Sequence, residues 1–204
     1  GETARGAIFG PENPLVPGAG EMEIPFAVHR VGGGMELEVE GRRYPLEVGG
    51  WTEWVRLAFR PGLGFRMRGL CRFLLLEAEP HFRLYATPLQ IDPAHPALPI
   101  SHPTLYSVYL ARKQDAFATL GVAEDLSALN EGVIGEDAFL EQCRTIQGER
   151  EEMFFDALAK TRKGLAVCVF DIVDRVQHGF WRFAEGEDST RGEGGGRHRH
   201  AIRD

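Results

Sequence analysis

Five runs between Met35 and Ile91 alternate apolar with polar residues, and turn-forming residues separate them. The runs read MELEVEG, RRYPLEVG, TEWVRLAF, FRMRGLCRFLLLEAE and FRLYATPLQI. Such alternation is typical of β-strands, because successive side chains point to opposite sides of a sheet. In the third run Val55, Leu57 and Phe59 share one face, and at least one of its two faces should be buried. The pattern predicts antiparallel hairpins, with five to seven strands packed as a sandwich or barrel.

The regions on either side of these runs differ from them in composition. Residues 1–34 are rich in Gly and Pro, with one strand-like run from Met22 to Val31. After Ile91 four prolines occur within DPAHPALPISHPTLY, which is typical of a linker between domains. We therefore expect three parts: a β-rich module at 1–91, a proline-rich linker at 92–103, and an α/β part at 104–204 with a flexible tail from about residue 185.

The α/β part is expected from the order of its elements. Short helical pieces are expected in TLYSVYLARKQ and GVAEDLSALNEGV, and the clearest helical periodicity runs from Glu136 to about Lys163, with a possible kink at Gln147-Gly148. Gly164 should end that helix. The run LAVCVFDIV then reads as a strand buried on both faces of a parallel sheet, followed by another helix. The expected fold class is thus α+β: an antiparallel β-rich module followed by a fragment of an α/β core.

Composition excludes several classes of partner. The net charge of −7 argues against a nucleic-acid polymer as partner, because phosphate backbones attract clustered Lys and Arg. No apolar run approaches the roughly 20 residues of a membrane span, so no membrane partner is expected. The three cysteines are widely spaced, which indicates neither a disulfide framework nor a CxxC metal site. A reducing, cytoplasmic setting is the expectation.

Asp174 and His178 form the candidate functional pair, and two interpretations of them remain open. In the first, Asp174 caps a helix that begins at Arg175, and His178 lies on the surface. In the second, the two side chains lie one helical turn apart and bind a divalent ion such as Zn²⁺. A catalytic zinc site usually has three protein ligands; His198 and His200 are candidates for the missing ones, and Asp171 for the acceptor that orients the imidazole.

The stretch FDIVDRVQHGFWRF resembles the motif D-R-x-Q-H-x-F-W-R of type I phosphodiesterase/nucleotide pyrophosphatase-like proteins in the alkaline phosphatase superfamily. Upstream stretches, among them FGPENPL, GGWTEWVRLAF and PISHP, are also similar to the middle region of those proteins. The resemblance implies that Asp174 and His178 bind one of two divalent ions, Zn or Mn, in an enzyme that hydrolyses a small phosphate ester. It implies further that 1–91 is an inserted module and that 104–204 is part of a catalytic core.

The sequence departs from that family in ways that bear on activity. It contains no Asp-His-Gly motif, and residues 1–34 show no strand-Asp-helix arrangement that would hold the family's Thr or Ser nucleophile. We therefore expect half of one metal site, no catalytic residue in this chain, no tightly bound metal and little activity of the chain alone. Substrate and leaving group stay open, because a fold does not fix them. Exposed sheet edges should favour self-association.

Two other functions stay open beside this one. The β-rich half is, alternatively, a binding or substrate-selecting module without catalysis, with Tyr44, Trp51 and Trp54 as candidate surface residues. A third interpretation is a small metalloprotein that uses Asp174, His178 and a tail histidine.

Overall fold

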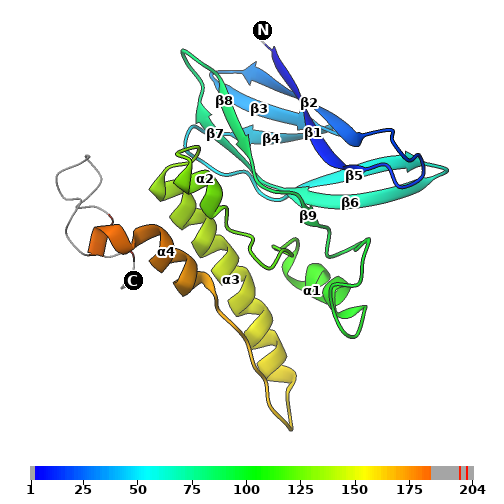
Figure 1. The fold of residues 1–204 in the computed structure, drawn as a ribbon, viewed down its shortest axis with the longest axis vertical. Helices are drawn as coiled ribbons and strands as arrows, with labels where there is room; N and C mark the ends of the chain where they lie inside the picture. Colours follow the sequence, from blue (N-terminus) through cyan, green and yellow to red (C-terminus); the bar gives the residue numbers. More distant parts are fainter. Residues whose placement is uncertain (1–2, 185–197, 199–200, 202–204) are drawn as a thin grey trace. The chain divides into compact units, whose positions relative to one another are not determined.

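The computed structural model of the chain describes residues 3–184, 198 and 201 (Figure 1). It shows a mixed α+β protein whose sheets are antiparallel. The chain divides into two compact units, Gly1–Gly121 and Val122–Asp204. Among the described residues, the first unit holds the strands and one helix, and the second holds three helices. Residues 92–103 lie within the first unit, and the domain boundaries expected from the sequence stay a prediction.

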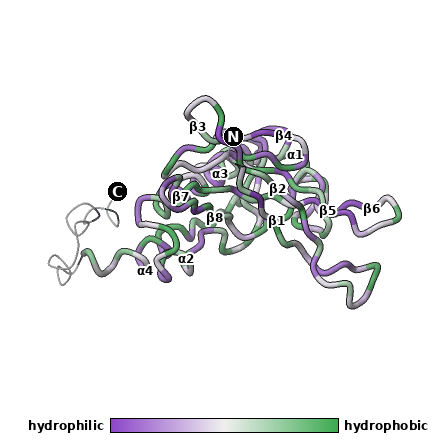
Figure 2. Tube along the Cα trace, turned by 90° about the horizontal axis from the view of Figure 1, so that it is seen from above, coloured by the Kyte–Doolittle hydropathy of each residue, from purple (hydrophilic) through white to green (hydrophobic). Residues whose placement is uncertain are grey.

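Three antiparallel sheets make up most of the first unit. A four-stranded sheet has the order β1-β2-β3-β4, a three-stranded sheet the order β5-β6-β9, and β7 pairs with β8. Figure 2 shows hydrophobic and hydrophilic residues interspersed along these strands. The bounds are β1 Thr3–Glu12, β2 Glu21–Val31, β3 Gly34–Val39, β4 Arg42–Leu46, β5 Val55–Gly62, β6 Phe65–Cys71, β7 Phe73–Glu77, β8 Arg83–Ala86 and β9 Gln90–Ile91.

Tight turns fix the register of the four-stranded sheet. Val31 pairs with Gly34, so Gly32 and Gly33 alone form the turn from β2 to β3, and both have positive φ, of 56° and 92°. A two-residue turn with positive φ at both positions matches the twist of a hairpin, and glycine adopts that conformation without a steric penalty. The local sequence therefore sets which side chains of β2 and β3 face the core.

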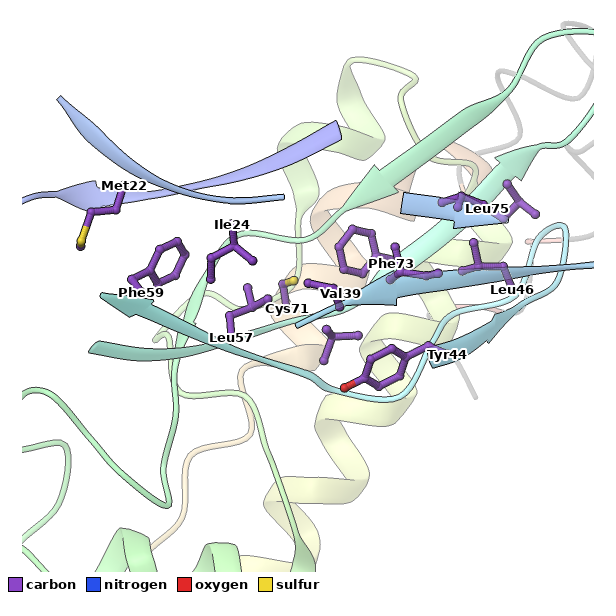
Figure 3. Close-up of a cluster of buried hydrophobic side chains, with 13 residues drawn as sticks. Met22, Ile24, Val39, Tyr44, Leu46, Leu57, Phe59, Cys71, Phe73 and Leu75 are labelled. Atoms are coloured by element: carbon purple, nitrogen blue, oxygen red, sulfur yellow. The ribbon is translucent and has the colours of Figure 1, made fainter. Parts of the chain in front are cut away.

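The core of the first unit lies between side chains of several strands. Figure 3 shows residues of β2, β3 and β4 pointing toward those of β5 and β7. Val55, Leu57 and Phe59 are buried, which confirms that one face of β5 lies in the core. Burial of one such side chain contributes about 1.5–3 kcal/mol. The buried set is Met22, Ile24, Val28, Leu37, Val39, Tyr44, Leu46, Val55, Leu57, Phe59, Cys71, Phe73 and Leu75.

The structure contains strand breaks and one strand that the sequence pattern did not predict. The strand β1 occupies part of the Gly- and Pro-rich region, where Gly6 and Gly10 hide the alternation. Its glycines allow aromatic rings to approach: a Cβ on Gly10 would lie 2.3 Å from the Phe59 ring. Between Gly34 and Ile91 the structure has seven strands, within the expected five to seven, because Arg72 and the TPL segment each divide one of the five runs into two.

The helices are α1 (Tyr106–Gln114), α2 (Leu126–Asn130), α3 (Glu136–Lys160) and α4 (Ile172–Ala184). The expected helical pieces at α1 and α2 are confirmed, and α3 runs through Gln147 and Gly148 without a break. Asp125 caps α2 by accepting a hydrogen bond from the Ala128 N–H at 2.9 Å. No helix among the described residues is long and apolar enough to cross a membrane.

The stretch from Leu165 to Phe170 differs most from the prediction of a buried strand. It belongs to no helix and to no sheet. Leu165, Val167 and Val169 are 86%, 74% and 76% exposed. The physical reason is that the described part of the second unit has no neighbouring strand to take the backbone hydrogen bonds of a sheet. Gly164, expected to end α3 directly, lies four residues beyond its last residue, Lys160.

Candidate functional site

Asp174 and His178 lie side by side on the outer face of α4. Asp174 Oδ1 is 3.4 Å from His178 Nε2, and the two side chains are 58% and 67% exposed. The opposite face of the helix is buried through Ile172 and Phe180. Residues four apart lie over one another along a helix, so the burial of one face fixes the outward direction of the pair. The structure therefore brings together the two side chains that the sequence singled out.

The helix begins earlier than expected, which changes the role of Asp174. Helix α4 starts at Ile172 rather than Arg175, so Asp174 lies in the first turn and not at the N-cap. Its carboxylate still lies near the positive end of the helix dipole, a position that favours acidic residues. The guanidinium of Arg175 is nearby, with Nη1 3.7 Å from Asp174 Oδ2. The expectation of an N-cap at Asp174 is wrong, and the carboxylate is available for other contacts.

The donor set fits half of a metal site. A carboxylate oxygen and an imidazole nitrogen are both suitable ligands for Zn²⁺ or Mn²⁺. Within the described residues, no group of three or more His, Cys, Asp or Glu side chains lies close enough to hold an ion. The pair can therefore supply two ligands, and the remaining ligands of a catalytic ion must come from other residues.

Asp171 has a different partner from the one considered in the sequence. Its carboxylate is hydrogen-bonded to the guanidinium of Arg150 on α3, and among the described residues it makes no hydrogen bond with His178. The role of Asp171 as the acceptor that orients the His178 imidazole stays a prediction. In the structure, its ion pair with Arg150 ties the residue just before α4 to the long helix α3.

Glu124 completes a charged cluster that sequence reasoning missed. Its carboxylate is fully buried, and Oε1 lies 3.9 Å from Arg150 Nη1. Neither oxygen of Glu124 accepts a hydrogen bond from the described residues. Arg150 thus lies near two carboxylates, those of Glu124 and Asp171. No sequence spacing signals this cluster, because its three residues come from different segments of the second unit.

The tail histidines do not extend the pair. His198 is buried, with its ring 5.6 Å from Phe180 and 5.7 Å from Phe183. Its Nε2 is 3.8 Å from Asp137 Oδ1. The structure thus places His198 in the aromatic core of the second unit rather than in a described group with Asp174 and His178. His200 lies outside the described residues.

The first unit has a histidine cluster of its own. His95 Nδ1 lies 3.2 Å from Asp92 Oδ2 and 2.8 Å from Arg68 Nη1. Asp92 is buried, and its Oδ1 accepts a hydrogen bond from the Ala94 N–H at 2.9 Å. Arg68 belongs to β6, whereas Asp92 and His95 lie in the loop after β9. These contacts therefore attach that loop to β6. This agrees with a structural role for His95.

The aromatic residues considered for a binding surface separate into two groups. Tyr44 is buried in the core of the first unit, so it is excluded from such a surface. Trp51 and Trp54 are half-buried. The Trp51 ring contacts Tyr85 edge-on at 5.9 Å, and the guanidinium carbon of Arg72 lies 5.5 Å from its centroid. Trp51 therefore has packing partners while part of its surface stays exposed.

The three cysteines are free thiols, and Cys71 and Cys143 are buried. The pKa of both thiols is raised from 9.0 to about 12, by burial in each case and, for Cys143, also by the charge of Glu124. A thiol that stays protonated at neutral pH is a poor nucleophile and a poor metal ligand.

Comparison with known proteins identifies no relative. No family model matches the chain, and no match is found among curated proteins or solved structures.

Proposed function

We propose that this chain supplies two ligands of one metal ion in a phosphohydrolase similar to the type I phosphodiesterase/nucleotide pyrophosphatase-like proteins. One observation carries the proposal. Asp174 and His178 lie 3.4 Å apart and face outward from α4, within a sequence motif that resembles the metal-binding motif of those proteins. Capping would account for Asp174 alone, but the helix begins before it and the cap role is excluded.

The chemistry divides between this chain and residues outside it. When bound, a pair of Zn or Mn ions would activate a nucleophile and stabilise the charge on a transferred phosphoryl group. In this chain, Asp174 would offer a carboxylate oxygen and His178 a neutral imidazole nitrogen to one of those ions. The Arg150–Asp171 ion pair would hold the start of α4 and so limit how far the two ligands move. The nucleophile and the remaining ligands belong to other residues, so the chain alone should bind metal weakly and turn over little substrate.

The finer architecture belongs to the same proposal. We place the sheets of the first unit as a sandwich that forms an inserted module, and the second unit as part of an α/β catalytic core. Support for the sandwich comes from buried side chains of β2, β3 and β4 that share a core with β5 and β7. Support for the core comes from Leu165–Phe170, an apolar segment that precedes α4 and the proposed ligands. The substrate is a small phosphate ester in a cytoplasmic setting.

Hydrolysis of bis(p-nitrophenyl) phosphate tests this function in a protein that contains the chain together with a nucleophile and the further ligands. With Zn²⁺ or Mn²⁺ present, we expect turnover that His178→Ala reduces by at least a hundredfold. His81→Ala is the matched control, because His81 is an exposed histidine of the first unit, and it should leave the rate unchanged. The 204-residue chain alone should show negligible turnover; robust metal-dependent turnover by it would refute the assignment of half a site.

A β-rich binding module without catalysis is the second candidate. It draws on the partly exposed Trp51 and Trp54, which lie near each other in sequence on the first unit. Exposed indole rings are frequent anchors in binding sites. The same assay separates the two candidates, because a binding module predicts that no longer protein carrying this chain hydrolyses the ester and that His178→Ala has no effect.

A further inference from the structure

A cleft of about 710 Å³ opens beside the core of the first unit. Its volume lies within the roughly 300–1,000 Å³ that is usual for small-molecule sites. One wall comes from strands β1, β2 and β3, and the other comes from the connection between β7 and β8, at residues 78–82. All of these segments belong to the first unit, so the cleft is formed by that unit alone.

The floor of the cleft is apolar and continuous with the core. Val28 is 2% exposed and is a member of the core. Ala4, Met35 and Ala78 are half-buried and pack against that core. Because two of these side chains are single methyl groups, space remains in the cleft that longer side chains would fill. Partly exposed apolar surface in a concave site favours a ligand with a hydrocarbon part.

Arg30 provides a positive charge on the core side of β2. Side chains alternate along a strand, so Arg30 shares its face with the buried Ile24 and Val28. Its cross-strand partner is Met35, which also lines the cleft. A guanidinium next to an apolar floor suits a ligand that has an anionic head and a hydrocarbon body, because the guanidinium presents several N–H donors in a fork that matches a carboxylate.

A carboxylate of the chain itself already occupies the position of such a head. Glu79 Oε1 lies 2.8 Å from Arg30 Nη2, and the two side chains are 71% and 41% exposed. An ion pair this exposed contributes little to stability, so its replacement by another carboxylate costs little. A ligand that joins a carboxylate to a hydrocarbon chain also removes the apolar floor from water, whereas the Glu79 side chain leaves the cleft open.

We propose that this cleft is a binding site for a small amphipathic carboxylate of the medium-chain fatty acid type. The ligand carboxylate takes the place of Glu79 on Arg30, and the hydrocarbon chain lies on the apolar floor. The site goes beyond the proposed function, because it uses residues of the first unit alone. It therefore stands or falls separately from the metal ligands proposed on α4.

Isothermal titration calorimetry of the whole chain with sodium octanoate tests the site. Octanoate should bind, and Arg30→Gln should raise its dissociation constant at least tenfold. Arg43→Gln is the matched control and should leave the constant unchanged, because Arg43 is also ion-paired but lies on the opposite face of the same sheet. Acetate, which has the carboxylate without the chain, should bind at least tenfold more weakly than octanoate. Absence of octanoate binding, or equal effects of the two arginine variants, overturns the proposal.

Two further variants test the head and the floor separately while Arg30 stays in place. Glu79→Gln should lower the dissociation constant of octanoate at least threefold, because a neutral amide competes less well for the guanidinium. Ala4→Leu should raise the constant at least fivefold, since the longer side chain fills the floor. Ala7→Leu, on the opposite face of β1, should leave it unchanged. An affinity that Glu79→Gln leaves unchanged or weakens, or that the two leucine variants change equally, contradicts the proposed mode of binding.

Discussion

Arg150 lies near two acidic side chains of the second unit. It is the described cation near both the buried Glu124 and the carboxylate of Asp171. Removing one partner of a largely buried ion pair leaves a carboxylate in a poorly solvated site, which is a far larger loss than that of a surface ion pair. The contact also determines how α4 begins, and hence where Asp174 and His178 lie.

Arg150→Met should therefore lower the free energy of unfolding by about 2–3 kcal/mol. Arg144→Met is the control, because Arg144 is an exposed arginine on the same helix, and it should change stability by less than about 0.5 kcal/mol. Urea unfolding followed by circular dichroism measures both. Equal midpoints for the two variants would show that the cluster is not stabilising.

The thiols should differ sharply in reactivity. With a pKa of about 12, Cys71 and Cys143 are thiolate to roughly one part in 10⁴ at pH 8. Iodoacetamide at pH 8 should label Cys168 alone in the folded chain and all three cysteines in urea, as counted by mass spectrometry. Because the folded pKa lies above the ordinary value of 9.0, burial of the two thiols stabilises the fold below about pH 9, and this contribution is lost as the pH rises toward 12. Rapid labelling of Cys71 in the folded chain would contradict this account.

Among the elements, α4 joins the core and the candidate site most directly. Phe180 is fully buried, and its ring stacks on Phe139 with centroids 6.1 Å apart. Gly179 brings the helix close to α2, because a Cβ there would lie 3.2 Å from Leu129 Cδ2. The packed face of α4 thus sets the direction in which its outer face points.

Phe180→Ala should cost about 3–5 kcal/mol of unfolding free energy, since it removes a large ring from a filled core. Trp181→Ala, on the neighbouring half-exposed position, should cost less than about 1 kcal/mol. Urea titrations of both variants give the comparison. If the two variants were equally stable, α4 would not be held by the face that the structure shows.

Some helices and strands could be predicted from local sequence patterns, and others could not. The alternation in β5 and the helical period of α3 predicted both elements, because burial of one face leaves a local signal. The four-residue spacing of Asp174 and His178 predicted that they lie one helical turn apart, as the structure shows. Strand β1 was missed because Gly6 and Gly10 have no side chain to reveal a face. The segment Leu165–Phe170 has the composition of a buried strand, but pairing depends on a neighbouring strand, which no local pattern specifies.

On the scale of the whole molecule, the two compact units contain different features. The first unit has the larger hydrophobic core and most of the hairpin signals. The second carries the proposed ligands, the charged cluster around Arg150 and the open apolar segment. Sequence patterns predicted the antiparallel character of the first unit well. They could not predict the Glu124–Arg150–Asp171 cluster, because it depends on long-range contacts in the second unit.

The central claim is that Asp174 and His178 together offer ligands to a divalent ion. Titration of the 204-residue chain with Mn²⁺, followed by histidine ring NMR signals, tests it directly, because paramagnetic broadening detects even the weak binding expected of two ligands. The His178 signals should broaden at a lower Mn²⁺ concentration than those of the exposed His81, and Asp174→Asn should abolish that difference. Equal broadening of His178 and His81, or an unchanged response in Asp174→Asn, would contradict the claim.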